Sequence, residues 1–221
     1  MVEVNTKLHA VLRSFNSGSV IELVNRLALA KSLESIIVVV DEKRDTIDTP
    51  KLLREASCPL PIKVIQLTEY GWSKALNVAI QSLPITDVSN DEFVMPISNE
   101  VLIEPDQIQM LLRVASQEDA SCGYALFEGR YELSYSVPRN TCAIWKRSLF
   151  STICYFNERL DNEGGMEDYD MVLCAFNRFH LLPFPSEERI KLVVRDPEHF
   201  AQKIAVEERA IKAIEIRYPK D

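Results

Sequence analysis

The sequence predicts an α/β protein with a mixed, mostly parallel sheet and helices on both of its faces. Two observations lead to this fold class. Short runs rich in β-branched residues alternate along the chain with segments whose apolar residues recur at helical spacing. The run at 35–40, SIIVVV, shows no polar alternation, as is typical of a strand buried on both faces of a parallel sheet.

The first half of the chain carries the clearest elements. The turn signal NSG at 16–18 separates an apolar strand from a segment with apolar residues three and four apart. Pro50 suits the first turn of a helix, because its fixed φ matches helix geometry and its missing N–H would have no partner there. The expected strands are 9–15, 35–40, 62–67 and 93–97, and the expected helices are 19–31, 49–56, 71–83 and 105–116.

The second half follows a less regular pattern of short apolar segments. An acidic stretch then leads into a helix, and a last strand and a C-terminal helix follow. The expected strands are 123–127, 131–135, 142–145 and 190–194, and the C-terminal helix is 197–217. Because no repeat or linker separates the halves, the chain is expected to form one domain, 1–221, with halves of about 1–104 and 105–221.

Composition limits the class of partner. The formal net charge of −8 and the pI of about 5.1 argue against nucleic acids and anionic membranes, because both partners require a basic surface. The five cysteines are odd in number and scattered, as expected of reduced thiols in a cytoplasmic protein. Neither a signal peptide nor a run of about 18 apolar residues is recognised, so no membrane span is expected.

The stretch at 156–170, FNERLDNEGGMEDYD, is the strongest chemical signal in the chain. It places six carboxylates around the pair Gly164-Gly165, directly before the apolar MVLCAF. Carboxylates at the start of a helix could accept a proton from a hydroxyl group or face a metal ion. Alternatively, they only complement the helix dipole in a solvated turn. Taken alone, the stretch favours the second interpretation, because acidic residues are common at helix starts.

Other polar residues follow the ends of the expected strands. In an open parallel sheet these ends lie along one edge, which is where ligands bind. These polar positions are Asn16, the segment 41–44, the segment 68–74 and the segment 98–100.

Four segments in the same order resemble the family-2 glycosyltransferases, which have the Rossmann-like GT-A fold. They are VVVDEK, GWSKALNVAI, FVMPISNEVLIEPD, and CAIWKRSLF together with FNERLDNEGGMEDYDM. The resemblance extends over about residues 8–200. It implies a nucleotide-binding first half, an acceptor-side second half, and transfer of a sugar from a nucleoside diphosphate to an unidentified hydroxyl group.

The resemblance also implies roles for individual residues. Asp168 matches the general base of inverting members, with Glu167 beside it as the second catalytic acid. Glu100 matches the metal-binding acid of the Asp-x-Asp motif, and His199 could complete a site for Mn or Mg, with His180 as the weaker choice. The implied donor-binding residues are Asp41, Glu42, Asn16, Lys74, Asn77, Ser98 and Asn99.

Several residues after the strand ends also have simpler interpretations. Asp41 could be an ordinary turn residue at a strand end. Lys43, Arg44 and Lys74 could offset phosphate charge or be solvated. Trp72 could stack on a base or sugar ring, but it is expected to cover the core beside Gly71.

The sequence also departs from the family pattern. Ser98 and Asn99 stand where the family has acidic residues, and Cys174 stands where it commonly has an arginine. These changes leave open a degenerate nucleotide-sugar-binding protein without catalysis. A nucleotidyltransferase is less favoured, because RSFNSGS lacks a glycine-rich basic loop. The C-terminal helix could pack on the domain or form a homodimer surface.

Overall fold

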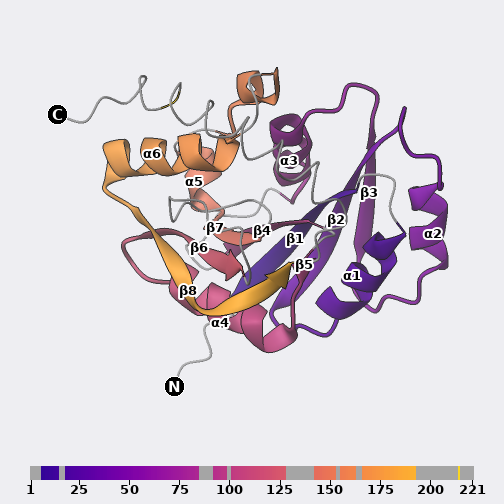
Figure 1. Ribbon diagram of the computed structural model, residues 1–221, viewed down its shortest axis with the longest axis horizontal. Coiled ribbons are helices and arrows are strands. Elements are labelled where there is room, and N and C mark those ends of the chain that lie inside the picture. The colour runs from indigo at the N-terminus through magenta and orange to yellow at the C-terminus, as the bar shows by residue number, and fades with distance from the viewer. Residues whose placement is uncertain are drawn as a thin grey trace.

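The computed structural model describes residues 6–14, 18–84, 92–98, 101–127, 142–152, 155–162, 166–192 and 214. These segments form an α/β fold around an eight-stranded sheet (Figure 1). The strands are β1 (Lys7–Ser14), β2 (Leu33–Asp41), β3 (Ile62–Leu67), β4 (Glu92–Ser98), β5 (Val101–Leu102), β6 (Ala120–Phe127), β7 (Ala143–Lys146) and β8 (Leu182–Leu192). The helices are α1 (Ser19–Leu27), α2 (Thr49–Glu55), α3 (Trp72–Gln81), α4 (Pro105–Ala115), α5 (Ser148–Thr152) and α6 (Glu167–Phe179), with a 3₁₀ helix, η1 (Glu158–Asn162).

The strand order places a topological switch point between β1 and β4. The order is β3-β2-β1-β4-β7-β6-β8-β5, and β1 pairs in parallel with both β2 and β4. The chain builds outward from β1 through β2 to β3, and then crosses back to place β4 on the other side of β1. In open α/β sheets, ligands bind outside the carboxyl ends of the strands at such a point.

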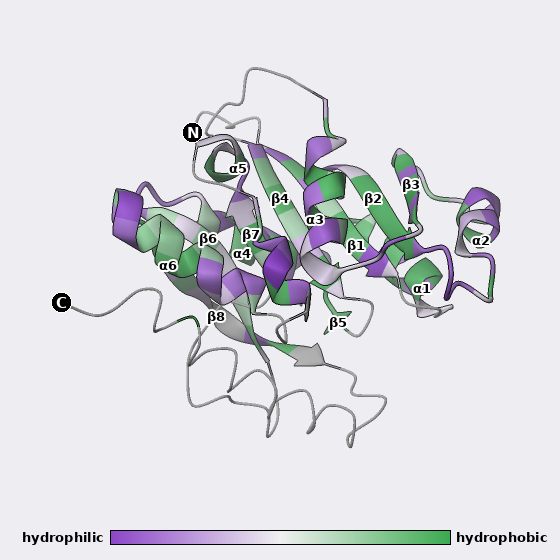
Figure 2. Ribbon diagram, turned by 90° about the horizontal axis from the view of Figure 1, so that it is seen from above, coloured by the Kyte–Doolittle hydropathy of each residue, from purple (hydrophilic) through white to green (hydrophobic). Residues whose placement is uncertain are grey.

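Two apolar cores cover the two faces of the sheet. One core joins the strands to α1, α2 and α4, and the other joins them to α3, α5 and α6. Figure 1 shows α3, α5 and α6 above the sheet, and α1 and α4 below it. Figure 2 shows that hydrophobic residues run along β1, β2 and β4. The central strands are therefore covered on both sides, as the apolar run in β2 predicts.

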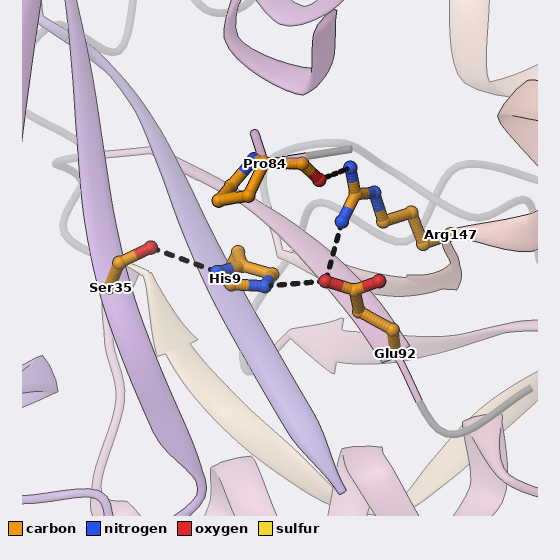
Figure 3. Close-up of polar contacts among 5 residues, drawn as sticks. All are labelled: His9, Ser35, Pro84, Glu92 and Arg147. Carbon is orange, nitrogen blue, oxygen red and sulfur yellow. Dashed lines mark hydrogen bonds and ion pairs between the residues drawn. The ribbon is translucent and has the colours of Figure 1, made fainter. Parts of the chain in front are cut away.

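A buried polar cluster lies at the amino ends of β1 and β4 (Figure 3). His9 Nε2 and Arg147 Nη1 both donate to Glu92 Oε1, at 3.0 and 2.5 Å. In the neutral imidazole, Nε2 donates to the carboxylate, so Nδ1 accepts from the Ser35 hydroxyl at 2.8 Å. Arg147 Nη2 donates to the Pro84 carbonyl at 2.6 Å. Glu92 thus joins His9 and Arg147, and the Ser35 hydroxyl and the Pro84 carbonyl bind the remaining polar atoms of these two side chains.

The predicted elements of the first half are confirmed, with small shifts at their ends. The strand at 62–67 has the expected bounds, whereas the first helix ends at Leu27 instead of residue 31. In the second half, β8 starts at Leu182, well before the expected residue 190. The strand expected at 131–135 lies outside the described residues, and so does the helix at 197–217 except for Ile214, which is helical and buried.

Two composition-based expectations concern cysteines and membrane spans. Among the cysteines in the described segments, none forms a disulfide. Within the same part of the chain, every helix is too short or too polar to cross a lipid bilayer.

Candidate functional site at the carboxyl edge of the sheet

The candidate site begins where β1 and β4 end, at the topological switch point. Arg13 of β1 and Ser98 of β4 are register partners in the parallel ladder. Register partners in a parallel pair place their side chains on the same face of the sheet. Val11, two residues before Arg13, and Val94, four before Ser98, belong to the core beneath α3 and α6, so this face is the one covered by those helices.

Arg13 is a buried cation that directly follows the apolar segment 10–12 of β1. Its side chain packs between an aromatic ring and a carboxylate: Cζ lies 4.2 Å from the centre of the Trp72 ring, and Nη1 donates to Glu167 Oε1 at 3.3 Å. Arg13 is only 8% exposed, and its Nε has no partner in the described part of the chain. A desolvated guanidinium with unused donor capacity is costly unless something else binds it.

The start of α6 brings buried carboxylates to the same place. Met166 at the N-cap has a left-handed backbone, with φ of 71°, and the helix begins with Glu167. Glu167, Asp168 and Asp170 are all buried, and Asp168 Oδ1 accepts from the Tyr169 N–H at 2.9 Å. All three acids lie in the first turn of α6, at the positive end of the helix dipole. The sequence-based expectation that they lie at a helix start is confirmed.

Asp41 closes the end of β2 with a tight turn. Its carboxylate accepts from the Lys43 N–H at 3.1 Å and lies 3.5 Å from Arg44 Nε. Its carbonyl accepts from the N–H groups of Arg44 and Asp45. Asp41 is buried although the residues that follow it are exposed. The turn therefore holds an acidic side chain at the carboxyl edge of the sheet, one strand away from Arg13.

Tyr70 adds a polar group to this edge. Burial raises the pKa of Tyr70 to about 12, with Arg13 opposing the rise and Asp41 and Asp161 adding to it. Its ring meets the Trp72 ring edge to face, with 6.3 Å between centroids. Five buried side-chain atoms lack a partner within the described segments, and four of these lie at this edge: Arg13 Nε, Ser14 Oγ, Tyr70 OH and Ser73 Oγ. Such a concentration of unsatisfied polar atoms is expected where a ligand binds.

The acidic stretch and α3 are tied together by hydrogen bonds. The Asp161 carboxylate accepts from the N–H groups of Ser73 at 2.6 Å and Lys74 at 3.2 Å, so it caps α3. Gly71 allows this approach, because a Cβ there would collide with the Asp161 carboxylate. Asn77 exchanges two hydrogen bonds with the backbone of Phe156, at 2.8 and 2.9 Å.

These contacts define the environment of the predicted donor-binding residues. The amide of Asn77 also donates to Glu158 at 2.9 Å, so its polar groups position the segment at 156–158. Lys74 is half-buried and pairs with Glu69 at 3.0 Å, and Glu42 is exposed. Asp41, Lys74 and Ser98 do share one edge of the sheet, at its carboxyl end. Their contacts with a substrate stay predictions.

The metal-binding assignments cannot be placed in the same way. Glu100 and His199 lie outside the described residues, and so do the donor-binding candidates Asn16 and Asn99. Within the described ranges, no three His, Cys, Asp or Glu side chains gather closely enough to hold a metal ion. The weaker candidate, His180, stands at the far end of α6, 12 residues and about 18 Å along the helix axis from Asp168.

One interpretation of the sequence is wrong, and three residues were missed. Trp72 does not cover the core: it is 41% exposed and one face of its ring receives Arg13. Arg13 received no role, whereas Tyr70 and Asp161 belong to the candidate segments 68–74 and 156–170 but received no role of their own. The signal for Arg13 was present, because a charged residue inside an apolar strand needs a partner.

The site therefore combines four chemical abilities at one edge. A carboxylate at the start of a helix can accept a proton. A guanidinium can bind an anion in a planar, bidentate manner. An exposed indole and a buried phenol can contact a ring or a hydroxyl group. An acid at the end of β2 can accept hydrogen bonds from a base or sugar.

The comparisons with known proteins identify the fold. No family model matches the sequence, and no curated protein matches it by sequence either. Solved structures match well. Staphylococcus aureus TarS 1–349 superposes with a TM-score of 0.64 at 21% identity over 91% of this chain and 65% of that chain. The structure of the same protein in complex with UDP-GlcNAc superposes with a TM-score of 0.65 at 20% identity, over 88% of this chain and 60% of that chain.

A third structure widens this group. The 4-diphosphocytidyl-2C-methyl-D-erythritol synthase from Anaerococcus prevotii DSM 20548 gives a TM-score of 0.60 at 9% identity, over 93% of this chain and 97% of that chain. The present chain spans less than two thirds of the length of the TarS chains that it matches. These likenesses show that the chain has a GT-A type fold, as the sequence predicts.

Proposed function

We propose that this chain is a glycosyltransferase that moves a sugar from a nucleoside-diphosphate donor to an acceptor hydroxyl group. One observation carries the proposal. The Glu167–Asp168 pair, Arg13 and Asp41 gather at the switch point of a fold that TarS shares, and TarS has been solved with UDP-GlcNAc and with UDP. A donor bound at this edge would place its charged diphosphate and its sugar near these groups.

Asp168 is the proposed general base. It is 5% exposed and lies in the first turn of α6, at the positive end of the helix dipole. It would take the proton of the acceptor hydroxyl as that oxygen bonds to the anomeric carbon. The bond from the anomeric carbon to the diphosphate then breaks, and its electron pair leaves with the nucleoside diphosphate. Attack opposite the leaving group would invert the anomeric configuration.

The residues around Asp168 would bind and orient the donor. Asp41 is proposed to accept hydrogen bonds from the nucleobase, and Trp72 offers an exposed ring face near it. The resemblance assigns Mn or Mg to Glu100 and His199, and this part stays a prediction because both residues lie outside the described segments. The acceptor would approach from the side of α6.

The test is turnover by an Asp168→Asn variant. The substitution preserves the size of the side chain but removes its basicity, and loss of a general base lowers kcat by about 100- to 10,000-fold. Release of UDP from UDP-GlcNAc and other UDP sugars would be measured with a panel of hydroxyl acceptors. UDP binding should survive in the variant, since the base acts on the acceptor. Undiminished turnover would remove Asp168 from this role.

Asp170→Asn is the matched control. Asp170 is in the same turn of the helix and is buried to a similar degree. A general effect of removing a buried carboxylate would reduce turnover equally in both variants. A specific role for Asp168 predicts that Asp170→Asn retains most of the activity of the original protein.

A non-catalytic nucleotide-sugar-binding protein is the alternative. Cys174, where the family commonly has an arginine, is buried in the apolar core of α6 and cannot offer a charge to the site. This interpretation predicts UDP binding without sugar transfer to any acceptor and without an effect of Asp168→Asn. Transfer to a single acceptor would exclude it.

A further inference from the structure

Arg13 is a buried cation at the switch point of the sheet. It is the register partner of Ser98, the first residue of the segment where the resemblance places the metal-binding motif. The two residues stand side by side at the switch point, and their side chains share one face of the sheet. The Arg13 guanidinium therefore lies beside the segment, beginning at Ser98, to which the resemblance assigns the divalent metal ion.

The surroundings of Arg13 do not use all of its donors. A guanidinium carries five N–H groups, and the hydrogen bond that the structure gives it goes to Glu167 at 3.3 Å. Its Nε is without a partner among the described residues although the side chain is 8% exposed. Charge-assisted hydrogen bonds to anions are normally shorter than 3.3 Å. The Glu167 contact thus leaves room for a stronger anionic partner.

Two features next to the Arg13 side chain disfavour a divalent cation there. Ser98 offers a neutral hydroxyl where an acid would be expected, and fewer anionic ligands bind a hard cation less tightly. A metal ion next to this position would also face the Arg13 guanidinium, and like charges in a poorly solvated site repel strongly.

We propose that Arg13 holds the diphosphate of the donor and supplies the positive charge that a divalent metal ion would otherwise supply. The inference rests on the proposed function and deepens it. When the bond from the anomeric carbon to the diphosphate breaks, the electron pair remains on the phosphate oxygen. A guanidinium stabilises this charge by hydrogen bonding, with no proton transfer and no further reactant.

Two neighbours hold the guanidinium in place for this task. Trp72 stacks against its plane at 4.2 Å, which fixes its orientation. Glu167 restrains it through the ion pair and lies next to the proposed base, Asp168. Arg13 would thereby connect donor binding to the start of α6. The competing explanation is that Arg13 does nothing except anchor Glu167.

The experiment measures how much each phosphate adds to nucleotide affinity. Uridine, UMP and UDP are titrated calorimetrically into the protein in excess EDTA, and again with Mn. A guanosine series runs in parallel. The proposal predicts that UDP binds more tightly than uridine in EDTA, and that Mn adds little. We call the ratio of UDP affinity to uridine affinity the phosphate gain. In Arg13→Gln the phosphate gain should fall by about 10- to 100-fold, whereas the affinity for uridine should not change.

Three further variants separate diphosphate binding from anchoring. Arg13→Lys keeps the positive charge but loses the planar guanidinium with its two parallel donors, so it should retain part of the phosphate gain. Glu167→Gln removes the ion pair and should keep or increase the gain, whereas a pure anchoring role predicts the same loss as in Arg13→Gln. Arg26→Gln, on the exposed face of α1, is the control for net charge and should behave as the original protein.

The outcomes separate this inference from the proposed function. UDP binding that disappears in EDTA overturns the inference and leaves a metal-dependent glycosyltransferase standing. An unchanged phosphate gain in Arg13→Gln overturns it as well, without touching the role of Asp168. If neither nucleotide series binds under any condition, the proposed function fails and the inference falls with it. Thermal unfolding of each variant checks that the comparison is between folded proteins.

Discussion

The pair β1–β4 has a buried polar cluster at each end, and the two clusters differ in how completely they are satisfied. At the amino end, His9, Glu92 and Arg147 pair with one another, and none of their buried polar atoms lacks a partner in the described structure (Figure 3). At the carboxyl end, Arg13 and Tyr70 each retain a buried atom without a partner. We call the cluster at the amino end a closed network, because its buried polar atoms all have partners among the described residues. The cluster at the carboxyl end is an open network, because some of its buried polar atoms have none.

This difference separates a structural cluster from a binding site. Buried polar groups that satisfy one another join the strands and add specificity to their pairing. Buried polar groups left without partners destabilise the protein unless a ligand completes them. We therefore expect substitutions at the amino end to affect folding and substitutions at the carboxyl end to affect binding. The following substitutions test that division.

The largest effect is expected for Glu92→Ala at the amino end. The substitution leaves the buried Arg147 guanidinium and the His9 ring without their shared acceptor, and breaking a buried ion pair costs about 3–5 kcal/mol. Urea unfolding would measure the loss. Glu22→Ala, which removes an exposed pair with Arg26, should cost less than about 0.5 kcal/mol. A similar loss in both variants would contradict the idea of a closed network.

The next effect is a pH dependence that originates at His9. Burial lowers the pKa of His9 below its ordinary 6.5, against the opposing influence of Glu92 and Glu34 and with the help of Arg147. The unfolded chain therefore binds a proton at higher pH than the folded chain does. Stability should be fully present above about pH 6.5, and should fall as the pH drops from there through the folded pKa, at no more than about 1.4 kcal/mol per pH unit.

A His9→Gln variant isolates this contribution. Its free energy of unfolding, measured by urea at several pH values, should vary less between about pH 7 and 5 than that of the original protein. The pKa of Glu92 is also lowered, because hydrogen bonds from His9 and Arg147 outweigh its burial. Protonation of Glu92 therefore adds a second loss of folding stability below about pH 4.5, and the His9→Gln variant should still show this second loss. An unchanged slope near neutrality would assign the pH dependence to other groups.

A smaller effect is expected for Asp161→Ala at the carboxyl end. The substitution exposes the first N–H groups of α3, and loss of a helix cap costs about 0.5–2 kcal/mol. Amide hydrogen exchange should accelerate first at Ser73 and Lys74. Asp161→Asn keeps an accepting oxygen and should recover most of the stability. If the two variants are equally destabilised, the carboxylate charge is more important than the cap.

The smallest effect on stability is expected for Tyr70→Phe. The hydroxyl group has no partner, so its removal should change the free energy of unfolding by less than about 0.5 kcal/mol or increase stability. Ser35→Ala, which removes the partner of His9 at the amino end, should cost about 1 kcal/mol. Tyr70→Phe should nevertheless weaken UDP binding if the hydroxyl contacts the donor. A large loss of stability would show that Tyr70 belongs to a closed network.

The fold was predictable because its signals are local. The apolar run of β2 and the turn and proline signals of the first half depend on residues close in sequence, and these elements occur where the patterns place them. β8 was recognised only at its end, because Pro183 and Pro185 argue against a strand. The strand nevertheless extends through both prolines, which stand opposite Cys122 and Tyr124 in the ladder with β6.

The site was predictable only in part, because its contacts join distant segments. The resemblance placed Asp41, Lys74 and Asp168 at strand and helix ends that meet at one edge. It did not find the Arg13 pair with Glu167, since these residues are 154 positions apart and nothing local links them. Trp72 was misjudged for the same reason: its exposure follows from the position of Arg13, which a single segment does not reveal.

The cap on α3 has a consequence for the order in which the protein is made. Ser73 and its cap, Asp161, are 88 residues apart, and Asn77 is 79 residues from its partner Phe156. At a synthesis rate of about 5–20 residues per second, the first turn of α3 would wait about 4–18 s for its partner to leave the ribosome. During that interval the first three parallel strands can pair, but the edge that carries the site stays unfinished. We expect the nascent chain to become competent for nucleotide only after the segment that follows α5 has been synthesised.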